Sequence, residues 1–258
     1  KSTQTISFTT IPNKLVNVAP FAVIATASSG LPVSFSIVSG HATISGNILT
    51  VTASGTVKVR VSQAGNALFT AATNVDKSFT VSKLTQTITF PSIATKLLNA
   101  APFVVSATAS SGLPITSYSI VSGPATIVGD LVTLTGVSGT VVVRATQSGD
   151  ATYSSKYFDR SITVSKLPQT ITIPTIPTKI FGAVSFVVSA TSNAGAGYPV
   201  TLSYVSGPAT VTPIAGSNDV LVTLTGAGTV VVKGTQLGDA TYAATTLSRS
   251  ITVSKATT

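Results

Sequence analysis

The chain has 258 residues, of which 43% are hydrophobic and only 8% are charged, and it carries a formal net charge of +9 at pH 7. It has no cysteine, methionine or tryptophan, which excludes disulfides, thiol chemistry and thiolate metal sites. Abundant Val, Ile, Ser and Thr with so little charge exclude a disordered chain, and no run of about 18 apolar residues is present to span a membrane as a helix.

One six-residue stretch occurs three times and sets the organisation of the chain. It reads Val-Ser-Gly-His-Ala-Thr in its first occurrence and Val-Ser-Gly-Pro-Ala-Thr in the other two, starting at Val38, Val121 and Val205. The glycines of the three stretches are 83 and 84 residues apart. A fixed period predicts tandem copies of one domain, here covering residues 1–83, 84–166 and 167–258.

Both ends of the chain coincide with boundaries between copies. Lys1 stands where Lys83 and Lys166 stand in the later copies, three residues before a Gln-Thr-Ile sequence. Lys255 closes the third copy in the same way that Lys83 and Lys166 close the first two. We therefore expect the chain to be a segment of a longer array.

Each copy is expected to form about seven short strands. In the first copy they cover residues 5–8, 21–27, 33–37, 43–45, 49–51, 57–61 and 79–81. Alternation is clearest in the sixth, where the valines from Val57 to Val61 should point inward and Lys58 and Arg60 outward. Gly and Pro mark the turns between strands. Many short strands without a helical period predict three tandem all-β domains, each a sandwich or a barrel.

The joints between copies are short. Val81 to Gln86 passes from a last strand to a first strand, and Leu167-Pro168 occupies the second joint. Short joints stiffened by proline favour an extended rod. The third copy departs from the others in a longer loop at residues 211–219 and in the stretch Ser192–Gly197, where the other copies have Ser-Ser-Gly-Leu-Pro.

Four stretches of the second copy carry a family likeness: Ala107–Pro114, Ser119–Thr126, Gly139–Val141 and Gln147–Tyr153. They resemble the bacterial immunoglobulin-like repeats of very large secreted surface proteins, and the likeness covers all three copies. The resemblance implies a seven-stranded immunoglobulin-like sandwich, located outside the cell or on the bacterial surface, that acts as a stalk or adhesive shaft. It implies no catalytic residues. Such repeats also stand beside enzyme domains, so the resemblance leaves adhesion and spacing open.

A Gly-Asp-Ala-Thr-Tyr loop recurs between the sixth and seventh strands. It starts at Gly149 and Gly238, and the first copy has Gly-Asn-Ala-Leu-Phe from Gly65. The loop can be interpreted as a polar contact for a ligand, or as a long connection in which an aromatic packs and Asp or Asn holds the turn. Because the first copy lacks both the Tyr hydroxyl and the Asp charge, we favour packing. The predicted structural anchors are Phe69, Tyr153, Tyr242, Asp150 and Asp239.

The cations are spread evenly, although the pI is about 9.9. They form no Lys/Arg run and are not interleaved with aromatics, so we expect no nucleic-acid partner. A diffuse attraction to an anionic cell-surface polysaccharide is the remaining partner hypothesis, with contacts at the equivalent positions Arg60, Arg144 and Lys233. The alternative is that each of these cations is solvated or locally paired.

Catalytic and metal-dependent functions find no support in the sequence. His41 is the only histidine, and Pro124 and Pro208 replace it in the other copies, which argues against a triad or a histidine-bound metal. The six Asp are scattered and Glu is absent, so neither a calcium site nor a repeated isopeptide crosslink is expected. The lack of Trp and the presence of only six Tyr also argue against a sugar-binding module. No cofactor is predicted.

Two functions remain open. The first is a non-enzymatic structural or adhesive stalk segment of a large bacterial cell-surface protein, which spaces or presents a distal binding region. The second is a spacer or accessory binding module of a secreted polysaccharide-degrading enzyme. Both predict a monomer whose partners are neighbouring copies of the same chain, and neither needs a membrane span.

Overall fold

Strands make up all the regular secondary structure of the computed structural model, which describes residues 1–256. They form three successive sets, one for each copy in the sequence. The first set is β1 (Ile6–Phe8), β2 (Lys14–Leu15), β3 (Phe21–Ala22), β4 (Ala25–Ala27), β5 (Ser34–Ser39), β6 (Ala42–Ser45), β7 (Ile48–Val51), β8 (Gly55–Ser62) and β9 (Val75–Ser82). In this described range, no helix is available that is long and apolar enough to cross a membrane.

The second and third sets repeat the first. The second is β10 (Ile88–Thr89), β11 (Lys96–Leu97), β12 (Phe103–Val104), β13 (Thr108–Ala109), β14 (Ser117–Ser122), β15 (Ala125–Val128), β16 (Leu131–Leu134), β17 (Gly139–Gln147) and β18 (Lys156–Ser165). The third is β19 (Ile171–Thr172), β20 (Lys179–Ile180), β21 (Phe186–Val188), β22 (Thr191–Ser192), β23 (Thr201–Ser206), β24 (Ala209–Pro213), β25 (Val220–Leu224), β26 (Gly228–Gln236) and β27 (Thr245–Ser254).

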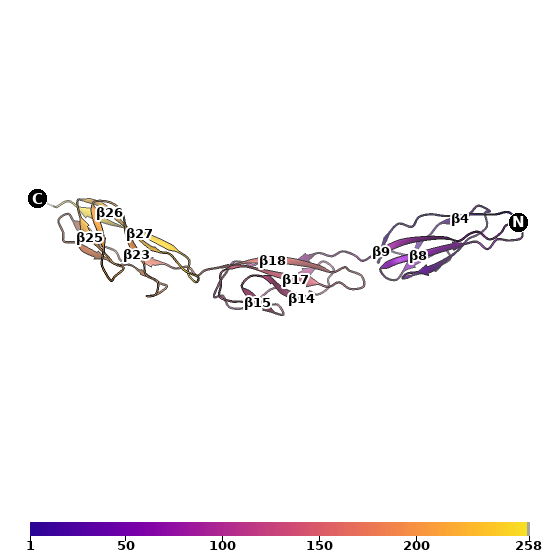
Figure 1. Cartoon of the computed structure of the whole chain (residues 1–258), viewed down its shortest axis with the longest axis horizontal. Coiled ribbons are helices and arrows are strands. Elements are labelled where there is room, and N and C mark those ends of the chain that lie inside the picture. The colour runs from indigo at the N-terminus through magenta and orange to yellow at the C-terminus, as the bar shows by residue number, and fades with distance from the viewer. Residues whose placement is uncertain (257–258) are drawn as a thin grey trace. The chain divides into compact units, whose positions relative to one another are not determined.

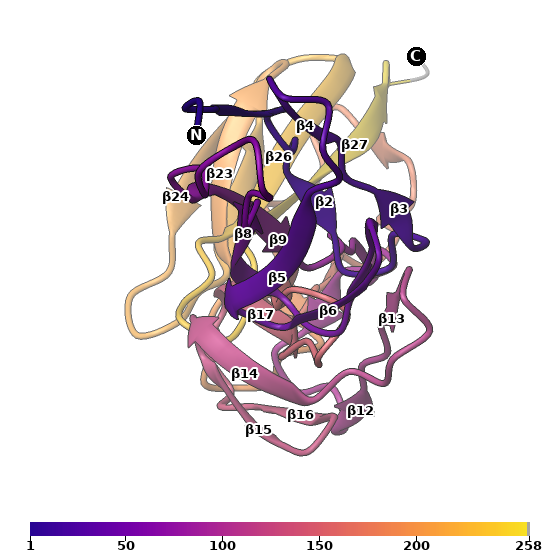
Figure 2. The same ribbon diagram turned by 90° about the vertical axis from the view of Figure 1, so that its right-hand side faces the viewer.

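Each set forms the same sheets. In the first copy these are a four-stranded sheet in the order β2-β9-β8-β5, a three-stranded sheet in the order β3-β7-β6, and the pair β1-β4. Figure 1 shows β8 and β9 side by side, and Figure 2 shows β12, β15 and β16 of the second copy together. This order corresponds to the two sheets of an immunoglobulin-like sandwich. The prediction of an all-β chain of three tandem sandwiches is confirmed.

Contacts divide the chain into two units. The first unit comprises Lys1–Ser92, Ser106–Ser119 and Arg144–Arg160, and the second comprises Ile93–Val105, Ile120–Val143 and the residues from Ser161 onward. The first copy lies wholly in the first unit and the third copy in the second, whereas the second copy contributes to both. The domain boundaries after residues 83 and 166 stay predictions that rest on the sequence repeat, and so does the extended arrangement of the three copies. Residues 257–258 lie outside the described range.

A short pairing that the alternation pattern does not reveal follows the first strand. β1 pairs antiparallel with β4, and β2 then pairs in parallel with β9, with Lys14 opposite Val81. Pro12 lies between them, and because proline has no N–H it ends one ladder and lets the chain join the other sheet. The Asn13 side chain accepts a hydrogen bond from the Thr80 amide at 2.8 Å and fixes the crossing.

The second predicted strand is divided in the structure. β3 pairs with β7 in the three-stranded sheet, whereas β4 pairs with β1. Between them the Val23 amide donates to the Asn47 carbonyl at 2.9 Å, and the Thr9 amide donates to the Ile24 carbonyl at 3.0 Å. The chain therefore changes partner at residues 23–24 while its side chains keep alternating.

The predicted alternation places the core correctly. Val57, Val59 and Val61 of β8 are fully buried, and Leu49 of β7 is fully buried opposite them in the same cluster. The third copy has an equivalent cluster around Val230, Val232 and Ile251. Full burial of one such side chain contributes about 1.5–3 kcal/mol, and these clusters give the first and third copies a core each.

The glycine of the repeated six-residue stretch allows a close approach between strands. Gly123 has φ +98°, and a Cβ at that position would lie 2.2 Å from the Thr140 carbonyl oxygen. Gly207 has φ +107° and the same 2.2 Å approach to the Thr229 carbonyl. Any side chain there would both clash with backbone and occupy a left-handed conformation, which explains the glycine at this position of the stretch.

Candidate functional site

A pair of glutamines joins separate loops in every copy. In the second copy, Gln86 Nε2 donates to Gln147 Oε1 at 3.0 Å and to the Ser154 carbonyl at 2.7 Å, and Gln86 Oε1 accepts from Ser111 Oγ at 2.6 Å. Both glutamines are buried. The corresponding pairs are Gln4 with Gln63 and Gln169 with Gln236. Removing Gln86 would take away three of the hydrogen bonds that hold these buried groups together.

The Gly-Asp-Ala-Thr-Tyr loop follows the second glutamine of each pair. Asp150 Oδ1 accepts hydrogen bonds from the amides of Thr152 at 2.8 Å and Tyr153 at 2.7 Å. These hydrogen bonds lower the pKa of Asp150, and the bond from the Tyr153 amide has the larger effect. Asp239 does the same with Thr241 and Tyr242, and its pKa is lowered for the same reason.

The first copy builds the same turn without a charge. Asn66 Oδ1 accepts from the amides of Leu68 at 2.8 Å and Phe69 at 2.9 Å. Phe69, Tyr153 and Tyr242 are partly buried, and each makes a single parallel β-bridge, to Ser2, Leu84 and Leu167 respectively. The structure thus places all five predicted anchors in the turn or in its pairing with the start of the same copy.

The joint between successive copies contains no unbonded stretch. Ser82 ends β9 and its carbonyl accepts from the Val16 amide at 2.9 Å. The next residue, Lys83, donates from Nζ to the Asp150 carbonyl at 2.6 Å, and the Leu84 amide donates to the Thr152 carbonyl at 2.8 Å. The chain therefore starts to pair with the loop of the next copy directly after the last strand of the previous copy ends.

The second joint has the same contacts. Lys166 Nζ donates to the Asp239 carbonyl, and the Leu167 amide donates to the Thr241 carbonyl at 2.8 Å. The Ala243 amide donates to the Leu167 carbonyl at 2.9 Å. In the sequence, Lys83 and Lys166 marked only the boundary between copies. Their position one residue after the last strand was the signal that they contact the next copy.

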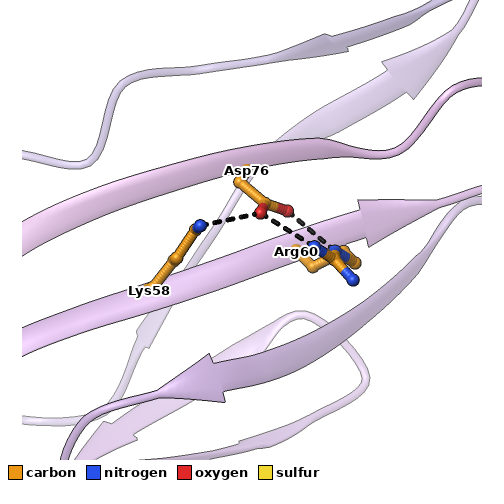
Figure 3. A network of polar contacts seen from close by, with 3 residues as sticks. All are labelled: Lys58, Arg60 and Asp76. Carbon is orange, nitrogen blue, oxygen red and sulfur yellow. Dashed lines mark hydrogen bonds and ion pairs between the residues drawn. The ribbon is translucent and has the colours of Figure 1, made fainter.

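The proposed polyanion contacts lie on the outer face of the four-stranded sheet. Arg60 on β8 forms a bidentate pair with Asp76 on β9, with Nε–Oδ1 and Nη2–Oδ2 distances of 2.8 and 3.0 Å. Lys58 approaches the same carboxylate at 3.1 Å, as Figure 3 shows. The hydrogen bond from Arg60 is the main cause that lowers the pKa of Asp76 to about 2.

Arg144 repeats this pairing and Lys233 does not. Arg144 Nε and Nη2 lie 2.7 and 2.8 Å from the two carboxylate oxygens of Asp159, and its guanidinium stacks 3.9 Å from the Tyr157 ring centroid. Lys233 on β26 pairs across the strands with Ser248, which has no charge. Arg60 and Arg144 are therefore each paired with a carboxylate of the chain, and a polyanion contact stays a prediction.

The part of the chain that the structure describes contains no group of three or more His, Cys, Asp or Glu side chains placed to hold a metal ion. His41 lies at the surface with Nδ1 3.2 Å from the Ser54 carbonyl oxygen. The repeated polar groups are engaged in loops, joints and strand pairs, and they do not converge on one site.

No protein-family model matches the sequence, and no curated protein matches it either. Among solved structures, the chain is similar to Drosophila N-cadherin EC1-3, at 16% identity over 96% of this chain and 99% of that one, with a TM-score of 0.36. It is similar to surface layer protein SbsC domains 1-6, at 14% identity over 98% and 40%, with a TM-score of 0.29.

A third solved structure to which the chain is similar is the I-band fragment I67-I69 of titin, at 11% identity over 98% of this chain and 99% of that one, with a TM-score of 0.26. At these identities and TM-scores, the assignment of the sandwich rests on the strand order of the chain itself.

Proposed function

We propose that the chain is a non-enzymatic stalk segment of a large bacterial cell-surface protein, which spaces or presents a distal binding region. The observation that carries the proposal is the joint between copies. Ser82 is the last residue of a strand, Lys83 already contacts the next loop, and Leu84 is already paired with it. A stalk needs joints with few free residues, because free residues act as a flexible linker.

The position of the terminal strands supports the same proposal. β2, near the start of the first copy, pairs in parallel with β9 at its end, and β11 with β18 and β20 with β27 repeat this. When a copy is pulled from its two ends, parallel neighbours are drawn in opposite directions along their length. Their hydrogen bonds are then strained together rather than one after another, which favours resistance to tension.

The proposal is tested by pulling the full chain between two handles in a force microscope. Cysteine handles can be added at both ends, because the chain has no cysteine of its own. We expect three separate unfolding events, each releasing 80 to 90 residues, or roughly 300 Å of extended chain at about 3.5 Å per residue. One event for the whole chain, or unfolding at negligible force, would contradict the proposal.

A further inference from the structure

The third copy departs from the other two at two places far apart in the sequence. The turn after β22 carries two more residues than its counterparts, and it ends in Tyr198 where the first two copies have Leu31 and Leu113. The connection between β24 and β25 is six residues long, Ile214 to Asp219, where the first copy has only Gly46 and Asn47.

The two departures meet in one pocket. It has a volume of about 330 Å³, and its lining includes Thr191, Ser192, Tyr198 and Val200 from the first segment and Asn218 from the second. Pockets for small ligands start at about 300 Å³, so this one has room for a single small molecule rather than an extended chain. None of its lining residues carries a charge.

Tyr198 is held in place as one wall of this pocket. Its ring meets that of Tyr242 edge-on, with centroids 4.8 Å apart, and its amide donates to the Gly195 carbonyl at 3.1 Å. A hydrogen bond with the Asp239 carboxylate is the main cause that raises the pKa of the Tyr198 hydroxyl. An aromatic wall fixed in this way loses little conformational entropy when a ligand binds.

Asn218 lies in a turn that is held by hydrogen bonds on both sides of it. The Ile214 amide donates to the Asp219 carbonyl at 3.1 Å, and the Asp219 amide donates to Ser217 Oγ at 3.0 Å. Within residues 1–256, the Asn218 carboxamide forms no hydrogen bond to another part of the chain. It therefore offers a donor and an acceptor to a ligand, whereas the hydroxyl of Ser192 is already bonded to Gln169.

We propose that this pocket binds one neutral sugar residue, such as the end of a glycan. A sugar ring has an apolar C–H face, which suits the Tyr198 ring, and hydroxyls that both donate and accept, which suit the Asn218 carboxamide and the Thr191 hydroxyl. No charged side chain lines the pocket, so it offers no ionic partner to an anionic sugar. The small number of aromatic residues argued against a sugar-binding module, but a pocket for one sugar needs only one aromatic ring, which Tyr198 supplies.

The proposal is independent of the stalk function and is tested with the full chain. The probes are the neutral methyl glycosides of glucose, galactose, mannose, fucose and N-acetylglucosamine, each titrated to ~50 mM, which covers a Kd of about 1–10 mM. Backbone NMR shifts report where each binds. We expect at least one to shift amides within residues 190–200 and 217–219 together, leaving the other copies unchanged.

Two variants test the site itself. Tyr198→Leu restores the residue that the first two copies carry, so the fold should persist, and we expect the affinity to fall at least 10-fold; Asn218→Ala should weaken binding as well. The matched control is Tyr157→Thr, which removes an exposed Tyr from the second copy. The third copy has Thr at the equivalent position, Thr246. The control should bind as the unaltered chain does.

Three results would overturn the proposal: no shift with any of the five glycosides, shifts that persist in Tyr198→Leu, or binding only of charged sugars such as glucuronic acid. The force pattern of Tyr198→Leu separates this proposal from the stalk function, because three unfolding events should remain when sugar binding is lost.

Discussion

The third copy contains one loop that repeats the sequence pattern of the other copies and two loops that differ from them. The loop from Gly238 to Tyr242 repeats a pattern found in all copies, and its Asp239 carboxylate is bonded to the backbone beside it. The turn after β22 and the loop from Ile214 to Asp219 are longer than their counterparts in the other copies, and they meet around a pocket where Asn218 offers unbonded polar atoms. Repeated residues therefore build the scaffold, and departures from the repeat are where binding should be sought.

The largest effect on stability is expected from substituting a glycine of the repeated stretch, and a glycine of the third copy's own turn serves as the comparison. Gly207→Ala places a Cβ 2.2 Å from the Thr229 carbonyl oxygen at φ +107°, and should destabilise the third copy by more than about 3 kcal/mol. Gly195 has a similar φ of +99° but no atom within 4 Å, so Gly195→Ala should cost only about 1–2 kcal/mol. Calorimetry of the full chain measures both, and equal losses would remove the distinction.

The buried glutamines are the next test. Gln86→Leu removes the hydrogen bonds to Gln147 Oε1, to the Ser154 carbonyl and from the Ser111 hydroxyl, and should destabilise the second copy by about 2–3 kcal/mol. Gln147 Oε1 keeps only its bond from the Gly149 amide. Asn218→Ala, at a position that does not repeat, should change stability by less than about 0.5 kcal/mol. Thermal unfolding compares the two, and a Gln86→Leu chain as stable as the unaltered one would break the account of the scaffold.

A smaller, pH-dependent effect is expected from the outer face of the first copy. The pKa of Asp76 falls from 3.8 to about 2 on folding, so its ionised form stabilises the first copy at every pH above about 4. This stabilisation should be lost as the pH falls from about 4 to 2. Asp76→Ser, which copies the Ser248 of the third copy, should flatten the fall of the midpoint temperature in this window. Parallel curves for both chains would contradict the pairing.

The smallest effect is expected from restoring the missing acid in the third copy. Ser248→Asp places a carboxylate opposite Lys233, as Asp76 stands opposite Arg60. An exposed pair of this kind contributes little, so the midpoint temperature should rise by no more than a few degrees and only at low salt. A clear loss of stability would show that the outer faces of the three copies differ in more than this pair.

The fold was largely predictable because its signals are periodic. Alternation from Val57 to Val61 identified the buried face, and the return of one stretch at Gly40, Gly123 and Gly207 identified three copies. The two-residue strand β2 escaped prediction, because a period of two cannot be seen in Lys14-Leu15. The division of residues 21–27 escaped too, since a change of partner strand does not alter which side chains face inward.

The site was harder to predict, because its parts lie far apart in the sequence. Gln86 and Gln147 each recur in all copies, and this was a signal that a shared partner exists, but the separation of 61 residues hides the pairing. Asp76 stands opposite Arg60 only after the strands are in register. Tyr198 and Asn218 were visible as departures from the repeat, but only the fold brings them to the same pocket.

Amide hydrogen exchange of the two joints tests the central claim most directly. The amides of Leu84 and Ser154 pair the first joint, and those of Leu167 and Ala243 pair the second. If no free linker separates the copies, these four amides should exchange nearly as slowly as those inside β8 and β26. Exchange at the rate of an unfolded chain, while the strand amides stay protected, would show free linkers at the joints and contradict the account.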